Sequence, residues 1–387
     1  MKLLTIDVHF EYPVYFTRDV FDRDNDSLAR AIRRKEPERR HRAMLVLDRG
    51  VVDSRPESWR VDIRNYFARH AIQIVEEVVL DGGEAVKNDT AALDGILSRI
   101  HQHALDRQSF VIIVGGGAVL DLAGHAAGIA HRGIRVVRLP TTVLSQADSG
   151  VGVKAAINAF GKKNFLGTFS PPFAVLNDVR FLETLTRRDA IAGMSEAVKV
   201  SLIRDRAFFE WLDAHTTDLA ARENAAVAEL VRRSAELHLA HIATSGDPFE
   251  MGSARPLDFG HWAAHKLESL THHRLRHGEA VAIGIAIDAF YSAAGGLCSE
   301  EVAGRVLATL RGLGFSLWDD AMAERRSDGK PRLLEGLEEF REHLGGELTL
   351  TMLRDIGRGE EIHEVDERLV LASIERLRHS GASAGTT

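Results

Sequence analysis

The sequence predicts an α/β N-terminal domain with a Rossmann-like, doubly wound parallel sheet, followed by an all-α C-terminal domain. At 387 residues the chain exceeds what one hydrophobic core usually organises. Up to residue 178, apolar runs of strand length alternate with helical segments, as in a parallel sheet covered on both faces. From residue 186 onward helical periods dominate. We therefore expect domains at 1–185 and 186–378, with a disordered tail at 379–387.

The expected elements follow from these periods. An alternating segment at 3–15 predicts an edge strand, and the charged segment 22–42 is expected to be largely helical with a solvated face. Further strands are expected at 43–48, 74–80, 110–114, 135–139 and 173–178, separated by helices at 58–70, 89–105 and 118–128. The second half predicts an exposed loop at 325–332, a short extended piece at 347–353, and helices at 187–202, 207–215, 225–243, 262–270, 279–294, 300–313 and 333–343.

The central stretch, residues 110–168, carries the strongest indication of a ligand site. Its strand ends on Gly115, Gly116 and Gly117, which can adopt positive φ and let phosphate oxygens approach the backbone, while the next helix offers its N-terminal N–H groups. The following strand runs into Thr141 and Thr142 at the sheet edge where ligands bind. Lysines and amides spaced by glycines come next and suit a phosphorylated polyol: Gln146, Asp148, Lys154, Asn158, Lys162, Lys163 and Asn164. The alternatives are a tight strand-to-helix turn and a solvated loop.

The helical half contains a candidate metal site. His261 and His265 stand four residues apart at the start of a helix, so both imidazoles point to one face. His277 precedes a second helix, and Glu196 lies at the start of a third. Two histidines and one glutamate form a divalent-metal site with open positions. Spacing alone leaves the choice open, because other histidines lie nearby: His238, His241, His272 and His273.

Composition limits the classes of partner. The net charge of −7 and the pI near 6.2 argue against general nucleic-acid binding. Cys298 is the only cysteine, so no intrachain disulfide can form, which fits a reducing compartment. No apolar run approaches membrane-spanning length. We therefore expect a cytoplasmic protein that binds neither nucleic acid nor membrane.

Taken in order, these residues resemble the sugar-phosphate cyclase family whose type member is 3-dehydroquinate synthase. The resemblance extends from about residue 80 to about residue 371. It rests on the joint order of its motifs: Gly115-Gly116-Gly117 with Asp121, Arg132-Gly133, Pro140-Thr141-Thr142, Gln146-Ala147-Asp148-Ser149, Lys154 with Asn158, Lys163-Asn164, Glu196 with Lys199, Gly260-His261 with His265, and His277-Gly278-Glu279. The run at 246–262 resembles a less characterised branch of the family found in Ebo-type operons.

The resemblance implies NAD⁺, Zn²⁺ (or Co²⁺) and a small-molecule sugar phosphate as ligands. NAD⁺ would lie over Gly115, Gly116 and Gly117 and contact Asp81, Glu84, Lys87, Asp121, Thr141, Thr142, Lys154, Lys163, Phe181 and Thr184. The metal would be held by Glu196, His261 and His277. Substrate binding and proton transfer would fall to Asp148, Lys154, Lys163, Asn164, Lys199 and His265. Arg132 would reach a neighbouring subunit's phosphate, which implies a homodimer.

The implied activity is that of a carbon-oxygen lyase acting on phosphates. A C7 ketose phosphate would be oxidised transiently, lose phosphate by β-elimination, be re-reduced and close to a carbocycle by an intramolecular aldol step. One alternative is a metal-dependent polyol or alcohol dehydrogenase of the iron-containing type, which needs no phosphate-orienting lysines. Another is a non-catalytic NAD-binding scaffold, against which the complete set of Glu196, His261 and His277 argues.

The sequence departs from the synthase pattern at positions that serve carboxylate and phosphate recognition. His238 replaces a lysine and Asp258 an asparagine. The remaining departures are Trp262 for a threonine, Val153 for a glycine, Arg255 shifted by one residue, and Arg341-Glu342-His343 in the C-terminal lysine region. We therefore expect a neutral C7 sugar phosphate, such as sedoheptulose 7-phosphate, to be preferred over the synthase's acidic substrate.

Overall fold

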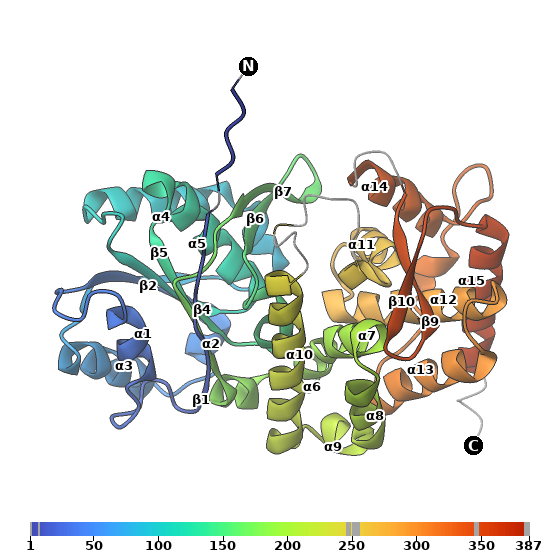
Figure 1. Cartoon of the computed structure of the whole chain (residues 1–387), viewed down its shortest axis with the longest axis horizontal. Coiled ribbons are helices and arrows are strands. Elements are labelled where there is room, and N and C mark those ends of the chain that lie inside the picture. The colour runs from blue at the N-terminus through green and yellow to red at the C-terminus, as the bar shows by residue number, and fades with distance from the viewer. Residues whose placement is uncertain (1, 7, 245–248, 250–255, 344–347, 383–387) are drawn as a thin grey trace. The chain divides into compact units, whose positions relative to one another are not determined.

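The computed structural model describes residues 2–6, 8–244, 249, 256–343 and 348–382. The chain divides into two compact units, Met1–Thr184 and Leu185–Thr387 (Figure 1). The first unit is built on a parallel sheet with helices, and the second is mainly helical. The predicted plan of a parallel α/β domain followed by a helical region is therefore confirmed.

The sheet of the first unit contains six parallel strands. Their order is β1 (Val14–Thr17), β8 (Ala174–Asp178), β5 (Arg135–Pro140), β4 (Phe110–Gly115), β2 (Arg42–Asp48) and β3 (Gln73–Leu80). The chain moves outward from β2 to β3, returns to β4 on the other side of β2, and continues outward through β5 to β8. The direction of winding thus reverses between β2 and β4. In open α/β sheets, ligands bind at the carboxyl ends of the strands beside such a reversal.

Helices cover both faces of this sheet (Figure 1). α1 (Ser27–Arg33) and α3 (Ser58–Arg69) pack in a core with the side chains of Leu45 and Leu47. α4 (Thr90–Gln102) and α5 (Gly117–Ile129) pack on the opposite face with Met44 and Val46. Because alternate residues of β2 enter opposite cores, the strand is apolar throughout its centre. The short helix α2 (Arg49–Asp53) follows β2 at the carboxyl edge.

Two predictions near the N-terminus were too long. The edge strand expected at 3–15 is limited to β1, because β1 pairs only with β8 and their register starts at Val14 and Val175. The carbonyl oxygen of Pro13 still accepts a hydrogen bond from N–H of Val175, just before the strand. The helix expected at 22–42 is limited to α1. Asp22 and Asn25 form local turns by accepting backbone hydrogen bonds before it, and Pro37 disfavours a helix after it.

The glycine-spaced lysines lie on a hairpin, which the sequence analysis did not predict. β6 (Lys154–Ala159) and β7 (Lys162–Phe169) form an antiparallel pair in which Ala159 faces Lys162. Phe160 and Gly161 make the two-residue turn with φ values of 53° and 73°. Positive φ at both turn residues matches the right-handed twist of the strands and closes the hairpin tightly. The sequence signal was weak because phenylalanine rarely adopts this conformation.

The second unit packs around α12 (His277–Ala294), which is buried along most of its length. A helix that is apolar on every side belongs in a core. α12 contacts α7 (Met194–Arg204), α11 (His261–Leu270), α13 (Glu300–Leu313) and α15 (Glu367–Ala382). The other helices are α6 (Arg187–Ala192), α8 (Arg206–Ala214), α9 (Thr216–Ala221), α10 (Asn224–Thr244) and α14 (Glu335–His343).

Three expectations for this unit need correction. The helix expected at 187–202 is divided at Gly193 into α6 and α7. The unit is not all-α, since β9 (Leu350–Asp355) and β10 (Arg358–Ile362) form a hairpin where we predicted only an extended piece. The tail expected from 379 is helical as far as Ala382, because buried Val370, Ile374 and Leu377 continue the apolar side of α15 almost to that point.

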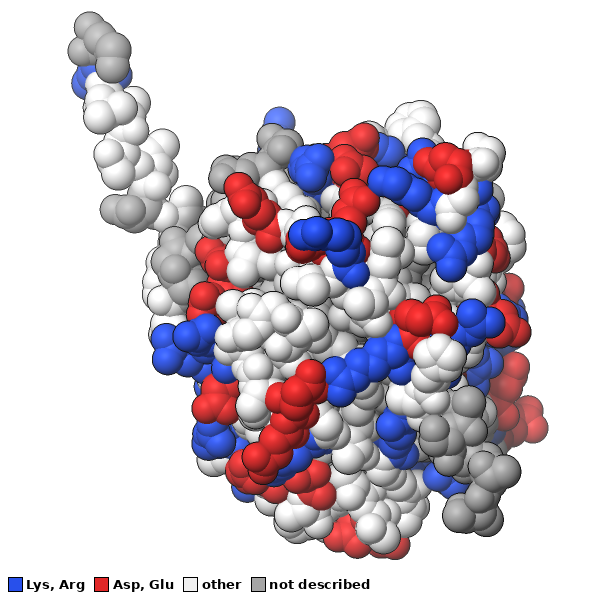
Figure 2. All heavy atoms as spheres, turned by 90° about the vertical axis from the view of Figure 1, so that its right-hand side faces the viewer, with Lys and Arg blue, Asp and Glu red and all other residues white. Residues whose placement is uncertain are grey.

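The surface shows no dominant charge on the face drawn in Figure 2. Basic and acidic side chains are interspersed there, and neither sign forms a continuous patch. Among the residues that the structure describes, no helix is both long enough and apolar enough to cross a membrane.

Candidate functional site

The glycine turn after β4 lies beside the reversal of the sheet. Gly116 has φ −72° and ψ 174°, and none of Gly115, Gly116 and Gly117 has positive φ, so our conformational argument for them was wrong. Close packing explains them instead. A Cβ on Gly115 would lie 2.9 Å from Cβ of Val119, and one on Gly117 would lie 3.0 Å from Oγ of Ser149. The turn thus brings the N-terminus of α5 close to its neighbours, and the backbone N–H groups of a helix N-terminus suit anions.

Asp48 is a member of this edge that we did not predict. It ends β2, is buried, and its Oδ1 accepts a hydrogen bond from N–H of Gly50 at 2.9 Å. Its Oδ2 lies 3.4 Å from the backbone nitrogen of Gly116, and a Cβ on Gly82 would approach the carboxylate to 2.7 Å. Burial raises the pKa of the Asp48 carboxyl, against the backbone donors. The available signal was an aspartate at the end of a buried strand, where a doubly wound sheet positions ligand-binding carboxylates.

A polar network joins five predicted residues in the first unit. The buried Lys87 ammonium lies 2.7 Å from Oδ2 of Asp121 and also contacts Oδ1 of Asn164. Asn158 donates to Glu84 at 3.1 Å and accepts from N–H of Asn164 at 2.9 Å. The network ties the segment after β3 to α5 and to the β6–β7 hairpin. These elements are therefore held together at one side of the glycine turn.

Arg138 holds the segment that carries Asp148 and Lys154. Its side chain is 1% exposed, and its guanidinium donates to the carbonyl oxygens of Gly152 at 2.7 Å and Lys154 at 3.1 Å, with a longer contact of 3.4 Å to Gly150. A buried guanidinium that donates only to backbone carbonyls fixes their direction. Our sequence reading of the strand at 135–139 did not identify this role, because an arginine within an apolar run gives no indication of its partners.

Other predicted residues of the first unit lie in varied settings. Thr141 is buried, and Thr142 bonds to Ser145, so both shape the turn after β5. Lys154 and Arg132 are exposed and Lys163 is half-buried. Asp81 pairs with Arg49, the ring of Phe181 packs in the core against Trp59, and the Thr184 hydroxyl donates to the carbonyl oxygen of Phe181. The Phe181 ring is thus a core side chain.

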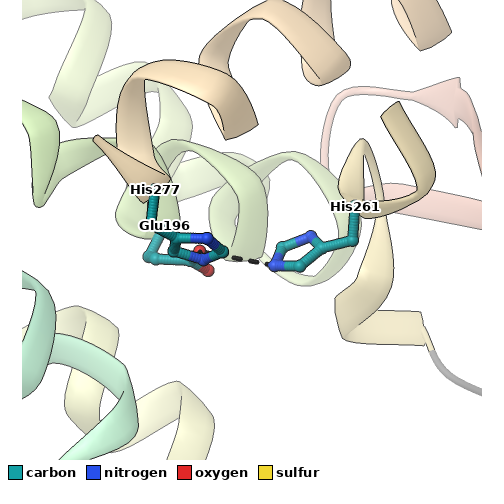
Figure 3. A group of neighbouring side chains, drawn as sticks. All are labelled: Glu196, His261 and His277. Carbon is teal, nitrogen blue, oxygen red and sulfur yellow. Dashed lines mark ion pairs between the residues drawn. The ribbon is translucent and has the colours of Figure 1, made fainter. Parts of the chain in front are cut away.

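Glu196, His261 and His277 come together in the second unit (Figure 3). One potential ligand atom from each lies within 4.8 Å of the others. Glu196 is buried on α7, His261 starts α11 and His277 starts α12. Nε2 of His261 is 3.5 Å and Nε2 of His277 is 3.3 Å from Oε1 of Glu196. Among the described residues this buried oxygen accepts no hydrogen bond. Two imidazoles and an unsatisfied carboxylate oxygen fit a divalent metal such as zinc.

Each of these three side chains is contacted by an outer partner. Nδ1 of His261 lies 3.2 Å from the carbonyl oxygen of Phe259. Nδ1 of His277 lies 3.0 Å from Oε2 of Glu268, a buried residue on α11 that we did not predict. The sequence could have indicated Glu268 by its position seven residues after His261, because this spacing puts both side chains on one face of the helix. With their Nδ1 atoms so engaged, both imidazoles present Nε2 to Glu196.

Lys199 and His265 lie beside this cluster. The buried Lys199, three residues after Glu196 on α7, contacts Oε2 of Glu196. Burial opposes ionisation of Glu196, but the Lys199 ammonium and the two imidazoles hold the pKa of its carboxyl well below the usual value. His265 is exposed, with its ring centroid 5.5 Å from that of His261 and 6.1 Å from that of His277. A carboxylate kept charged, with imidazoles around it, is prepared to bind a cation.

Glycines allow the helices that carry the ligands to approach closely. Gly260, with φ 78°, precedes His261, and a Cβ there would lie 2.6 Å from the backbone nitrogen of Ile285. Gly278 follows His277, and a Cβ there would lie 1.7 Å from the carbonyl oxygen of Ala192. The positions of both histidines therefore depend on backbone contacts that no larger residue permits.

Several departures from the synthase pattern are also located. Trp262 is in the core and not at a recognition surface: it is 2% exposed, and its indole N–H donates to Asp288 at 2.9 Å. Asp288 also accepts from N–H of Gly260 at 2.9 Å. Val153 is buried, and His238 and Asp258 are half-buried on α10 and on the turn Pro256–Asp258. Arg255 and most of the run at 246–262 that precedes Pro256 lie outside the described residues.

Solved structures with this architecture define the class. 2-epi-5-epi-valiolone synthase from Streptomyces hygroscopicus subsp. jinggangensis 5008, with NAD⁺ and Zn²⁺ bound, is 25% identical with a TM-score of 0.85, covering 98% of this chain and 100% of its own. 2-deoxy-scyllo-inosose synthase, complexed with carbaglucose-6-phosphate, NAD⁺ and Co²⁺, shares the fold at 23% identity with a TM-score of 0.75, covering 94% and 96%. The fold is thus that of the sugar-phosphate cyclases.

Sequence comparison specifies the family within this class. The family model for the 3-dehydroquinate synthase N-terminal region matches residues 77–192, and that for the C-terminal region matches residues 193–328. A 3-dehydroquinate synthase of Ruegeria sp. (strain TM1040) is 36% identical over 364 residues, covering 92% of this chain and 94% of its own. The chain belongs to the 3-dehydroquinate synthase family.

Proposed function

We propose that this protein is an NAD- and divalent-metal-dependent sugar-phosphate cyclase that converts a C7 ketose phosphate to a carbocycle with loss of phosphate. The observation that carries the proposal is the cluster of Glu196, His261 and His277, in which each side chain has its own outer partner. A scaffold without activity would have no need of a complete and oriented ligand set. Membership of the 3-dehydroquinate synthase family supports the same reaction class.

The first unit supports NAD⁺ binding at its carboxyl edge. The glycine turn, the N-terminus of α5 and Asp48 lie beside the reversal between β2 and β4. Backbone N–H groups there suit a pyrophosphate, and a carboxylate suits ribose hydroxyls. The solved cyclases with NAD⁺ bound have the same fold. We assign the cofactor contacts to this edge and to the network of Glu84, Lys87 and Asp121.

The chain's own side chains supply charge and proton transfer. Lys154, Lys163 and Arg132 are exposed or half-buried cations on the first unit, suited to orienting a phosphate. Lys199 and His265 adjoin the metal ligands, which supports our assigning them proton exchange with a substrate. When bound, NAD⁺ would exchange a hydride with the substrate and the divalent ion would favour loss of a hydroxyl proton. We further propose that Arg132 serves a neighbouring subunit in a homodimer.

The substrate we propose is a neutral C7 sugar phosphate such as sedoheptulose 7-phosphate. α10, which carries His238, and the turn of Asp258 both contact α7, the helix of Glu196 and Lys199. A histidine carries no permanent positive charge at neutral pH, and an aspartate would repel a substrate carboxylate. Arg341 is 3.0 Å from Glu338, so this cation already has a carboxylate partner. The departures therefore reduce the positive charge offered to an acidic substrate.

The test is a direct comparison of two substrates. Purified protein with NAD⁺ and Zn²⁺ is given sedoheptulose 7-phosphate or the acidic ketose phosphate of 3-dehydroquinate synthase, and released inorganic phosphate and the carbocycle are measured. We expect turnover without accumulation of NADH, a higher kcat/KM for the neutral substrate, and no activity in Glu196→Ala. A preference for the acid would restore the plain synthase assignment. Free NADH produced from a simple polyol would identify a dehydrogenase instead.

A further inference from the structure

Glu268 is a buried carboxylate in the second unit that the function proposed above uses only as the outer partner of His277. Its side chain is 4% exposed, and it lies on α11, the helix of His261 and His265. A buried carboxylate needs a donor to offset its loss of hydration. Nδ1 of His277, on the neighbouring helix α12, lies 3.0 Å away, within the ordinary range of an N–H···O hydrogen bond. The contact joins the two helices that provide the imidazoles of the cluster.

This contact determines which nitrogen of His277 faces the cluster. An acceptor at Nδ1 places the proton of the neutral ring there, so Nε2 has a free lone pair. Nε2 is the atom that lies 3.3 Å from Oε1 of Glu196. In the opposite tautomer, the N–H would be on Nε2 and would point toward the metal position. The lone pair of Nδ1 would then face a lone pair of the Glu268 carboxylate, which is unfavourable. A carboxylate acceptor at Nδ1 also strengthens an imidazole as a metal ligand.

We propose that Glu268 is the positioning residue for His277 in the metal centre: it sets the ring's orientation and tautomer and strengthens the bond from Nε2 to a divalent ion. The inference rests on the proposed metal-dependent function. It assigns to Glu268 no contact with the ion or the substrate. Among the residues that the structure describes, the corresponding acceptor for His261 is the carbonyl oxygen of Phe259, at the longer distance of 3.2 Å. His277 is therefore the imidazole whose ligand strength depends on a charged side chain.

The experiment measures Zn²⁺ affinity, not turnover, in the full-length protein by competition with a chromophoric chelator. Glu268→Ala removes both the acceptor and the charge, and outer partners of metal-bound histidines typically contribute about 10-fold to 100-fold in affinity, so we expect a loss in that range. Glu268→Gln retains an acceptor oxygen but not the charge, so we expect a smaller loss. Glu339→Gln is the matched control. Glu339, on α14, lies 2.7 Å from Lys266, which is on α11 as Glu268 is, and the loss of this contact should leave the Zn²⁺ affinity unchanged.

Two further readouts separate positioning from a general structural effect. The visible spectrum of the Co²⁺-loaded protein reports ligand geometry, and we expect it to change in Glu268→Ala and to return toward wild type in Glu268→Gln. Urea unfolding of the metal-free proteins measures separately the stability lost with the buried hydrogen bond, and Glu268→Gln, which retains an acceptor, should lose less than Glu268→Ala. If Glu268→Ala does not fold, Glu268→Gln alone must weaken Zn²⁺ binding and alter the Co²⁺ spectrum.

Three results would overturn the proposal. Equal Zn²⁺ affinity in wild type and both Glu268 variants would show that the contact does not strengthen the ligand. Two Zn²⁺ ions per wild-type chain and one in the Glu268 variants would make Glu268 a ligand, since His265, Glu268 and His277 also have potential ligand atoms within 4.8 Å of one another. A wild-type protein that binds no divalent metal would refute the proposed function itself, which distinguishes that failure from the other two.

Discussion

Replacing Asp288 by asparagine should change how the stability of the second unit depends on pH. Asp288 is 1% exposed on α12 and accepts hydrogen bonds from N–H of Gly260 and from the indole of Trp262. Burial raises the pKa of this carboxyl from 3.8 to about 7, against both donors. Because the folded-state pKa lies above the unfolded one, the folded protein binds the extra proton, and stability falls as pH rises toward 7.

The magnitude follows from the interval over which only the folded state is protonated. Between pH 5 and pH 8 that interval is about two pH units, and each unit corresponds to about 1.4 kcal/mol, so the wild type should lose about 3 kcal/mol through this group. Asparagine does not titrate. It satisfies only one of the two donors, so Asp288→Asn should be the less stable protein at pH 5, and its deficit should shrink by about 3 kcal/mol at pH 8.

Urea unfolding followed by tryptophan fluorescence, with a chelator present to remove metal, measures both proteins at pH 5, 6.5 and 8. Glu338→Gln, which changes an exposed carboxylate on α14, is the control and should show no such trend. A stability difference between Asp288→Asn and wild type that stays constant within about 1 kcal/mol from pH 5 to pH 8 would refute the reasoning, because a buried acid must then be ionised without penalty.

Three other substitutions test separate parts of the structure. Gly278→Ala should lower the free energy of unfolding by about 1–3 kcal/mol and also lower the metal content, because its Cβ would overlap the Ala192 carbonyl. Gly304→Ala, whose Cβ would lie in open space, is the control and should change neither. Equal metal content in the Gly278→Ala and wild-type proteins, measured by mass spectrometry, would contradict this. Arg138→Met should lower the free energy of unfolding, measured in urea, by about 2 kcal/mol or more, because the carbonyl oxygens of Gly152 and Lys154 lose their donor. An unchanged midpoint of urea unfolding would contradict this role of Arg138. Gly116→Val should weaken NAD⁺ binding by about 2 kcal/mol or more, measured by calorimetry, and unchanged affinity would refute the placement of the pyrophosphate.

The strands of the central sheet could be predicted from sequence because burial on both faces leaves a continuous apolar run. β2 and β4 are examples, since their alternate side chains enter the two cores on opposite faces of the sheet. Elements whose limits depend on a neighbour were harder. β1 starts at Val14, where its pairing with β8 starts. The β6–β7 hairpin depends on a phenylalanine with positive φ, which no composition rule favours.

The site could be predicted only as far as local spacing and family resemblance reach. His261 and His265 share a helix face by their spacing, but only the resemblance selected His277 and Glu196 among the other candidates. The contacts of Asp48, Arg138, Glu268 and Asp288 were not predicted. Each of these side chains bonds to a partner on another element, so its role depends on how those elements pack.

The sequence by itself thus determined the α/β and helical halves, the glycine turn and the types of side chain available for a metal. Periodicity and composition are local properties, and they are sufficient for these features. The tertiary structure decided which nitrogen of His277 faces Glu196, and it placed Trp262 in the core beside Asp288. The physical reason is that hydrogen bonds and burial depend on distances between helices, which close contacts such as those of Gly260 and Gly278 set.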